Sequence, residues 1–216
     1  MGLQTLQFFR LPALGVRTLI ALAIASFFVV AEITGSDNIH LSTRDTVLGI
    51  LFLLGTGFSE EMFSRAFMLG ALYKFGRKSA IFFSSLVFGL MHLNLYVGSE
   101  WNPWHAYWHV VNAASFGVFI CALMIVTRSI WVGVIFHALV DWGIVFDKER
   151  APLPAEKVWH PAFWEGLSYP LFNCLIYLGL AVFLLQIDRG SAPAWVYPLA
   201  VKCKLVERPV PYQTMR

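Results

Sequence analysis

The sequence predicts an all-α integral membrane protein, a polytopic helical bundle of about six transmembrane helices in a single membrane-embedded domain over residues 1–216. Hydrophobic residues make up 58% of the chain and charged residues only 13%, whereas a soluble domain carries about 25% charged residues. The apolar residues also gather in long runs, and a helix needs about 20 such residues to cross a hydrocarbon core roughly 30 Å thick.

Six apolar runs are long enough to be spans. In chain order they are Leu11–Ile33, Thr46–Tyr73, Ser79–Val97, Ala106–Thr127, Ser129–Phe146 and Gly166–Ile187. The first run is too long for a cleaved signal peptide and no A-x-A site closes it, so we expect a retained helix. The second run is interrupted by charges. Residues 188–216 are polar and contain several prolines, which predicts a polar cytoplasmic tail.

The distribution of Lys and Arg predicts the orientation, because cytoplasmic loops carry an excess of these residues. If the N-terminus is cytoplasmic, the inner flanks hold more of them than the outer flanks. The inner residues are Arg10, Lys74, Arg77, Lys78, Arg128, Arg189, Lys202, Lys204, Arg208 and Arg216; the outer ones are Arg44, Lys148, Arg150 and Lys157. We therefore expect a multi-pass protein of the plasma membrane with both termini in the cytoplasm.

Composition also excludes some partners and cofactors. A net charge of +3, with no basic stripe interleaved with aromatic residues, argues against nucleic acid. The three cysteines are widely spaced and form no CxxC motif, so neither a zinc knuckle nor a disulfide framework is expected. Nothing in the sequence indicates an oligomeric state.

The motif Glu60-Glu61-x-x-x-Arg65 lies midway along the second run. Ionisable residues in a span are costly and usually face the protein interior or a wet cavity. Glu61 and Arg65 are four residues apart and can pair on one helix face, whereas Glu60 points about 100° away. One acid can thus be neutralised while the other stays available as a general base. The alternative is a junction between two half-helices, with the charges at an interface.

Two further motifs repeat a spacing of four residues. Phe88 and His92 share a face of the third run, although a lone histidine in a helix is more often a hydrogen-bonded core residue than a catalyst. His137 and Asp141 share a face of the fifth run, where the acid can orient the imidazole ring and fix its tautomer. The alternative for this pair is a structural brace between two helices.

Two other histidines, His105 and His109, lie at the outer end of the fourth run among Trp101, Trp104 and Trp108. Aromatic belts occupy that level of a bilayer, so we interpret both histidines as interfacial.

Depth in the membrane links the three motifs. Measured from the cytoplasmic end of each run, Glu60 and His92 lie about 21 Å deep and His137 about 12 Å deep at 1.5 Å per residue. Given that the helix ends are not fixed by the sequence, the three groups reach a similar layer. Polar residues without a common role need not do so, and the combination therefore indicates one site.

The order Glu-Glu-x-x-x-Arg, Phe-x-x-x-His and His-x-x-x-Asn/Asp on successive helices resembles the CPBP intramembrane proteases, the CAAX protease and bacteriocin-processing (Abi) family that includes the type II CAAX prenyl endopeptidases. The stretch Ala114–Trp142 is also similar to this family. The resemblance covers roughly residues 45–146, which we expect to be the catalytic core.

The resemblance implies a role for each motif residue. Glu60 would match the glutamate that activates water, assisted by His92. Glu61 and Arg65 would match the pair that holds the site together.

The third motif would match the groups that stabilise the oxyanion, His137 and Asp141. The best-studied members carry Asn at the position of Asp141, and a carboxylate cannot donate a hydrogen bond as an amide can. Asp141 would instead orient His137, hold a proton or bind a metal.

A metal is an open alternative. Two histidines and a carboxylate suit zinc, and the ligands would be His92, His137 and Glu60. No His-Glu-x-x-His motif is present. The family was classed as metalloproteases from its motifs, while a metal-free glutamate mechanism is favoured for its members, so we expect no tightly bound cofactor.

The function expected from these residues is that of an intramembrane endopeptidase. It would hydrolyse a peptide bond of a membrane-associated protein or peptide with Glu-activated water, and its partners would be the lipid bilayer and that substrate. The alternative is a non-catalytic bacteriocin-immunity or scaffold protein on the same fold. A proton-coupled carrier ranks last, because no internal repeat is visible.

Overall fold

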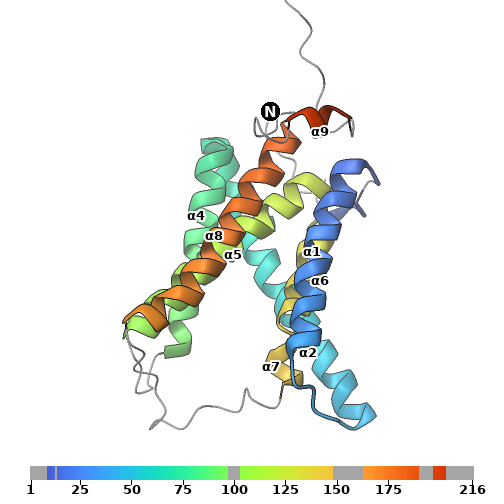
Figure 1. Cartoon of the computed structure of the whole chain (residues 1–216), viewed down its shortest axis with the longest axis vertical. Helices are drawn as coiled ribbons and strands as arrows, with labels where there is room; N and C mark the ends of the chain where they lie inside the picture. The colour runs from blue at the N-terminus through green and yellow to red at the C-terminus, as the bar shows by residue number, and fades with distance from the viewer. Residues whose placement is uncertain (1–8, 13, 97–102, 148–162, 190–196, 203–216) are drawn as a thin grey trace, which may run out of the picture.

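The computed structural model describes residues 9–12, 14–96, 103–147, 163–189 and 197–202. These residues form a bundle of helices (Figure 1). In chain order the helices are α1 (Val16–Gly35), α2 (Thr43–Glu61), the π-helix η2 (Met62–Leu69), α3 (Gly70–Leu72), the 3₁₀-helix η3 (Tyr73–Phe75), α4 (Arg77–Met91), the 3₁₀-helix η4 (His92–Tyr96), α5 (Pro103–Thr127), α6 (Ile130–Val140), α7 (Trp142–Phe146), α8 (Phe163–Asp188) and α9 (Tyr197–Lys202). Within the described ranges, β-pairing is limited to a bridge between Asn38 and Asp147.

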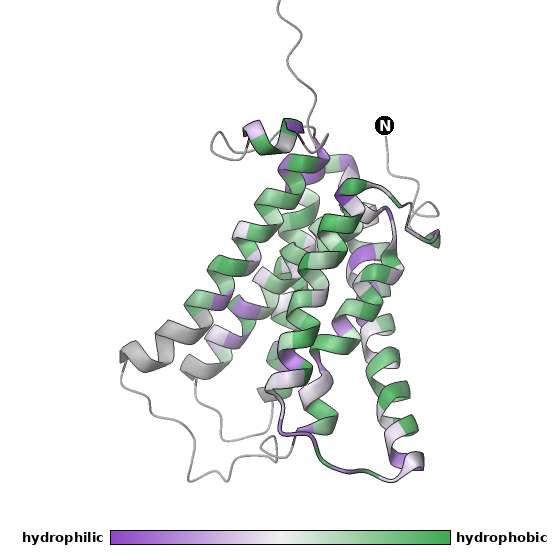
Figure 2. Cartoon of the chain, turned by 45° about the vertical axis from the view of Figure 1, so that its right-hand side comes forward, coloured by the Kyte–Doolittle hydropathy of each residue, from purple (hydrophilic) through white to green (hydrophobic). Residues whose placement is uncertain are grey.

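The predicted all-helical membrane fold is confirmed. Five of the described helical segments are long and apolar enough to cross a bilayer: Val16–Gly35, Thr43–Phe75, Arg77–Leu95, Ala106–Thr127 and Leu171–Asp188. The fifth predicted run corresponds to a shorter apolar segment, Ile130–Phe146. Figure 2 shows that hydrophobic residues predominate along the long helices, and many of their large apolar side chains, such as Phe27, Phe52 and Phe82, are exposed, as expected for helices that face lipid.

Local sequence explains where several helices begin. Gly15 is extended, which delays α1 to Val16 rather than Leu11. The Ser42 side chain accepts a hydrogen bond from the backbone N–H of Asp45 and so caps α2. Gly76 has a φ of 101°, a conformation that favours glycine, and it separates η3 from α4.

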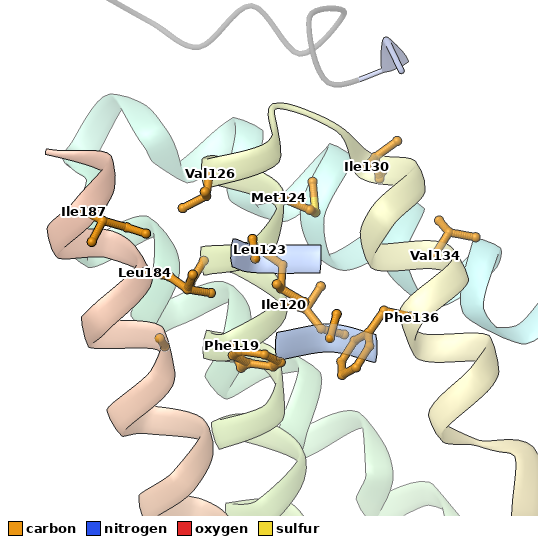
Figure 3. Close-up of a cluster of buried hydrophobic side chains, with 14 of the residues drawn as sticks. Phe119, Ile120, Leu123, Met124, Val126, Ile130, Val134, Phe136, Leu184 and Ile187 are labelled. Atoms are coloured by element: carbon orange, nitrogen blue, oxygen red, sulfur yellow. The ribbon is translucent and has the colours of Figure 1, made fainter. Parts of the chain in front are cut away.

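Helix α5 is the centre of the bundle, because it packs against α8, α4, α6 and α1. In Figure 1, α8 lies along α5. Figure 3 shows apolar side chains of α5, α6 and α8 around this centre. The labelled residues are Phe119, Ile120, Leu123, Met124, Val126, Ile130, Val134, Phe136, Leu184 and Ile187, all of them buried.

Two glycines allow close helix contacts beside the polar motifs. A Cβ atom on Gly57 would lie 2.9 Å from the carbonyl oxygen of Val134, where α2 meets α6. A Cβ atom on Gly89 would lie 2.6 Å from the carbonyl oxygen of Val110, where α4 meets α5. Small residues of this kind let helix backbones approach one another in membranes. Gly57 precedes Glu61 by one turn and Gly89 lies just before His92, so these contacts set the spacing of the helices that carry the motifs.

Replacing Gly89 by Ala should therefore force α4 away from α5. We expect a loss of about 1–3 kcal/mol of stability, the usual cost of overpacking. Thermal unfolding of the detergent-solubilised protein would measure this loss. Gly55→Ala is the matched control, because a Cβ atom on Gly55 would meet nothing within 4 Å. Equal unfolding temperatures for the two variants would contradict the close contact.

Candidate active site

The Glu60-Glu61-x-x-x-Arg65 motif lies where the helix changes its winding. Helix α2 ends at Glu61, and Met62–Leu69 continue as a π-helix. The helical backbone runs without a break from Thr43 to Phe75, so the motif is not a junction between two separated half-helices. Short π-helical segments inside α-helices are frequent at functional sites.

Glu61 and Arg65 form a fully buried ion pair. The Nε atom of Arg65 lies 3.1 Å from Oε2 of Glu61, and neither side chain is exposed. The Nη2 atom of Arg65 donates to the carbonyl oxygen of Gly117 over 3.4 Å. The guanidinium carbon lies 4.4 Å from the centre of the Phe88 ring, a cation–π contact. The pair that the sequence predicts on one helix face is thus locked between α4 and α5.

The buried pair also fixes His137 on α6. The Nδ1 atom of His137 lies 2.7 Å from Oε1 of Glu61. An ionised carboxylate only accepts hydrogen bonds, so Nδ1–H is the donor and Nε2 is left to face the opposite side. There, Nε2 lies 3.8 Å from Oε2 of Glu60 and 3.5 Å from Oδ2 of Asp141. One imidazole ring therefore lies among three carboxylates, two from α2 and one from the break after α6.

A break between α6 and α7 positions Asp141. Helix α6 ends at Val140 and α7 begins at Trp142. The short helix α7 is tied to the α1 side of the bundle: the Nε1 atom of Trp142 donates to Oδ1 of Asn38 over 2.6 Å, and the backbone N–H of Gly143 donates to Oε1 of Glu32 over 3.3 Å. The Asp141 side chain is 27% exposed and that of Glu60 is 29% exposed. These two carboxylates are thus the accessible members of the cluster.

His92 joins the site through the Phe88 ring rather than through Glu60. The rings of His92 and His137 lie 4.9 Å and 5.8 Å from the Phe88 ring, centre to centre. Nδ1 of His92 lies 2.9 Å from the carbonyl oxygen of Phe88, which is an acceptor, so Nδ1–H is the donor. Among the described residues, His92 makes no hydrogen bond to Glu60.

His109 is a residue that sequence analysis assigned to the membrane interface. Its ring lies 5.1 Å from that of His92, centre to centre. Phe116, seven residues further along α5, lies 5.2 Å from the His137 ring. Residues seven apart share a helix face, so this spacing was the available signal. Both residues line the α5 side of the cluster.

The site is closed on the side that faces the α5–α6 turn. On that side of Arg65, the hydroxyl groups of Ser84 and Ser85 lie 3.6 Å and 3.8 Å from the sulfur of Cys121. A buried hydrophobic cluster follows, made of Leu69, Ala80, Ile81, Cys121 and Ile125. These packed side chains therefore block access to His137 and its carboxylates from the end of the bundle that holds the α5–α6 turn.

The three residues considered as zinc ligands do not form a ready metal site. Within the described ranges, no three His, Cys, Asp or Glu side chains are arranged to hold a metal ion. Nδ1 of His137 already donates to Glu61, and His92 reaches the site only through the Phe88 ring. Glu60, His92 and His137 thus do not fit a three-ligand zinc centre in this arrangement.

Comparison with known proteins identifies the region that carries the motifs. Residues 42–143 match the family model described as type II CAAX prenyl endopeptidase Rce1-like. This range contains all three motifs and nearly coincides with the predicted core of residues 45–146, so the resemblance inferred from the motifs is confirmed. No curated protein and no solved structure matches the chain.

Proposed function

Because residues 42–143 match the Rce1-like family model, we propose that the chain is an intramembrane endopeptidase that hydrolyses a peptide bond of a membrane-associated protein or peptide. One observation carries this proposal. Glu60 and Asp141 face the Nε2 atom of His137, while a buried Glu61–Arg65 pair fixes the opposite edge of the same ring. A structural ion pair would need no second, partly exposed acid beside it.

Glu60 is the proposed general base. Its Oε2 atom is 3.8 Å from Nε2 of His137, longer than a hydrogen bond, which leaves the carboxylate able to accept a proton from water. The hydroxide attacks the carbonyl carbon of the scissile bond, and the carbonyl oxygen becomes an anion. The oxyanion then re-forms the carbonyl as the C–N bond breaks, and the proton held by Glu60 passes to the nitrogen of the departing amine, so the carboxylate is regenerated.

His137 is the proposed donor to that oxyanion. With Nδ1–H bound to Glu61, a proton on Nε2 makes the ring a positively charged donor directed at the developing charge. Asp141, 3.5 Å from Nε2, favours this charged form of the ring and orients it. As a carboxylate it does not donate to the oxyanion.

Water and substrate reach the site from the side where Glu60 and Asp141 are partly exposed, because the opposite side is filled by packed side chains. His92, at the start of η4, and His109 on α5 border this side of the site, with their rings 5.1 Å apart, centre to centre. We also infer that both termini are cytoplasmic and that the plasma membrane holds the protein, on the Lys and Arg asymmetry; a reporter that folds only outside the cytoplasm, fused to either end, should be inactive.

A cleavage assay on the protein reconstituted in liposomes tests the function. His137→Gln is expected to lower the rate of cleavage of a membrane-associated peptide by about 10²- to 10³-fold, the usual loss for one oxyanion donor. His40→Gln is the control, since His40 is an exposed histidine between α1 and α2. A non-catalytic scaffold would show no cleavage in any variant.

The same assay with a chelator tests the metal-free mechanism. We expect the wild-type rate to stay unchanged. Loss of activity that added zinc restores would contradict water activation by Glu60 alone.

A further inference from the structure

A cluster of arginines surrounds Asp188, the last residue of α8, at the end of the bundle opposite the open layer of the active site. Nη1 of Arg77 lies 2.9 Å from Oδ2 of Asp188, and Nη2 of Arg128 lies 3.1 Å from Oδ1. Nη1 of Arg17 donates to the backbone carbonyl oxygen of Asp188 over 3.2 Å. One aspartate therefore receives donors from three arginines.

The three arginines come from distant parts of the chain. Arg17 is in the first turn of α1, Arg77 is the first residue of α4, and Arg128 lies in the turn between α5 and α6. These helix ends lie together near the top of Figure 1. Arg128 has a φ of 57°, a conformation that few non-glycine residues adopt. The tight turn thus holds an arginine where a glycine would be easier to accommodate.

The cluster has more positive charge and more donors than its own residues satisfy. The side chains of Arg77 and Arg128 share the single carboxylate of Asp188, so these three groups together carry a net charge of +1. Among the residues that the structure describes, the buried Nε and Nη2 atoms of Arg77 and the buried Oγ atom of the neighbouring Ser129 find no hydrogen-bond partner. The Arg128 side chain is 60% exposed, and its ion pair uses one end of the guanidinium fork. Buried donors are normally hydrogen-bonded, so the N–H groups of Arg77 indicate that an anionic acceptor binds here.

The depth of the arginine cluster in the membrane indicates which anion is available to bind there. Helix α8 has 26 residues and is therefore about 39 Å long, longer than the hydrocarbon core of about 30 Å and close to the 40–45 Å of a bilayer with its headgroup regions. Asp188 at its end thus lies among lipid headgroups. Lys74, Lys78 and Lys202 occur at the same end, which the Lys and Arg asymmetry assigns to the cytoplasmic leaflet with its anionic lipids.

We propose that Arg17, Arg77 and Arg128 around Asp188 form a binding site for the phosphate group of an anionic phospholipid. The guanidinium fork matches phosphate oxygens in pairs. Arg128 makes the first contact, since it is the exposed member. Asp188 orders the arginines and neutralises only part of their positive charge. A bound headgroup then connects the ends of α1, α4, α6 and α8.

Native mass spectrometry of the full chain in detergent, titrated with phosphatidylglycerol, tests the site independently of any cleavage. We expect phosphatidylglycerol to bind more tightly than phosphatidylcholine. Arg128→Gln should raise the dissociation constant for phosphatidylglycerol about fivefold, because one arginine near a lipid surface contributes about 1 kcal/mol to binding. Arg128→Lys keeps the charge and should lose less. Arg44→Gln, an exposed arginine at the first turn of α2, should change nothing.

Three results would overturn the proposal. Equal binding of phosphatidylcholine would remove the role of charge, and equal weakening by Arg44→Gln would remove the role of the cluster. Displacement of phosphatidylglycerol by equimolar inorganic phosphate would assign the site to free phosphate rather than to lipid. Because Arg128 is exposed, its variants should keep the wild-type unfolding temperature, which the same samples can verify.

Discussion

Replacing Glu60 by Gln is expected to lower the rate of peptide-bond cleavage by about 10²- to 10⁴-fold, the contribution of a positioned general base. The amide has nearly the shape of the carboxylate but takes no proton from water. The side chain is 29% exposed and does not belong to the buried Glu61–Arg65 pair. The variant should therefore fold like the wild-type protein and fail only in catalysis.

The measurement is single-turnover cleavage of a membrane-associated peptide in liposomes, with circular dichroism to verify the fold. Asp45→Asn is the matched control, because Asp45 lies on the same helix, about 22 Å away at 1.5 Å per residue. A wild-type rate for Glu60→Gln would remove Glu60 from the mechanism. An unfolded Glu60→Gln variant would contradict the division of roles in which Glu60 acts in catalysis and Glu61 in the buried ion pair.

Replacing Arg65 by Met should have the largest effect on stability. It leaves the buried Glu61 carboxylate without its guanidinium partner, and breaking a buried ion pair in this way costs about 3–5 kcal/mol. The hydrogen bond to Gly117 and the contact with the Phe88 ring are lost as well. Chemical unfolding in micelles, followed by tryptophan fluorescence, would measure the loss.

A second substitution separates charge from packing. In the double variant Glu61→Gln, Arg65→Met, no buried charge remains uncompensated, so most of the lost stability should return. Activity should stay low, because a neutral amide no longer holds His137 as a charged carboxylate does. If the double variant is as unstable as Arg65→Met alone, the loss comes from packing and not from the unpaired carboxylate.

Periodicity and length made the fold and part of the site predictable. Apolar runs of about 20 residues located the long helices, and the spacing of four residues brought Glu61 to Arg65 and His137 to Asp141. Depth along each run linked α2 with α6, as the contact between Glu61 and His137 bears out. These features depend only on helix geometry, which the sequence determines locally.

Features that depend on helix winding or on distant contacts were not predictable. The π-helix of Met62–Leu69 has the same residue pattern as an α-helix, so periodicity cannot distinguish the two. The contact of His109 with His92 depends on how η4 turns after α4. The arginines around Asp188 are separated from it by as many as 171 residues in the chain. Only packed helices bring such residues together.

The central claim is that side chains from α2 and α6 act together on one water molecule and one peptide bond. A double-mutant cycle with Glu60→Gln and His137→Gln, measured by single-turnover cleavage in liposomes, tests it most directly. Residues that act as one unit have strongly non-additive effects. The double variant should be at most about tenfold slower than the slower single variant. A rate lowered by the product of the two single effects would show that Glu60 and His137 act independently and would contradict a shared site.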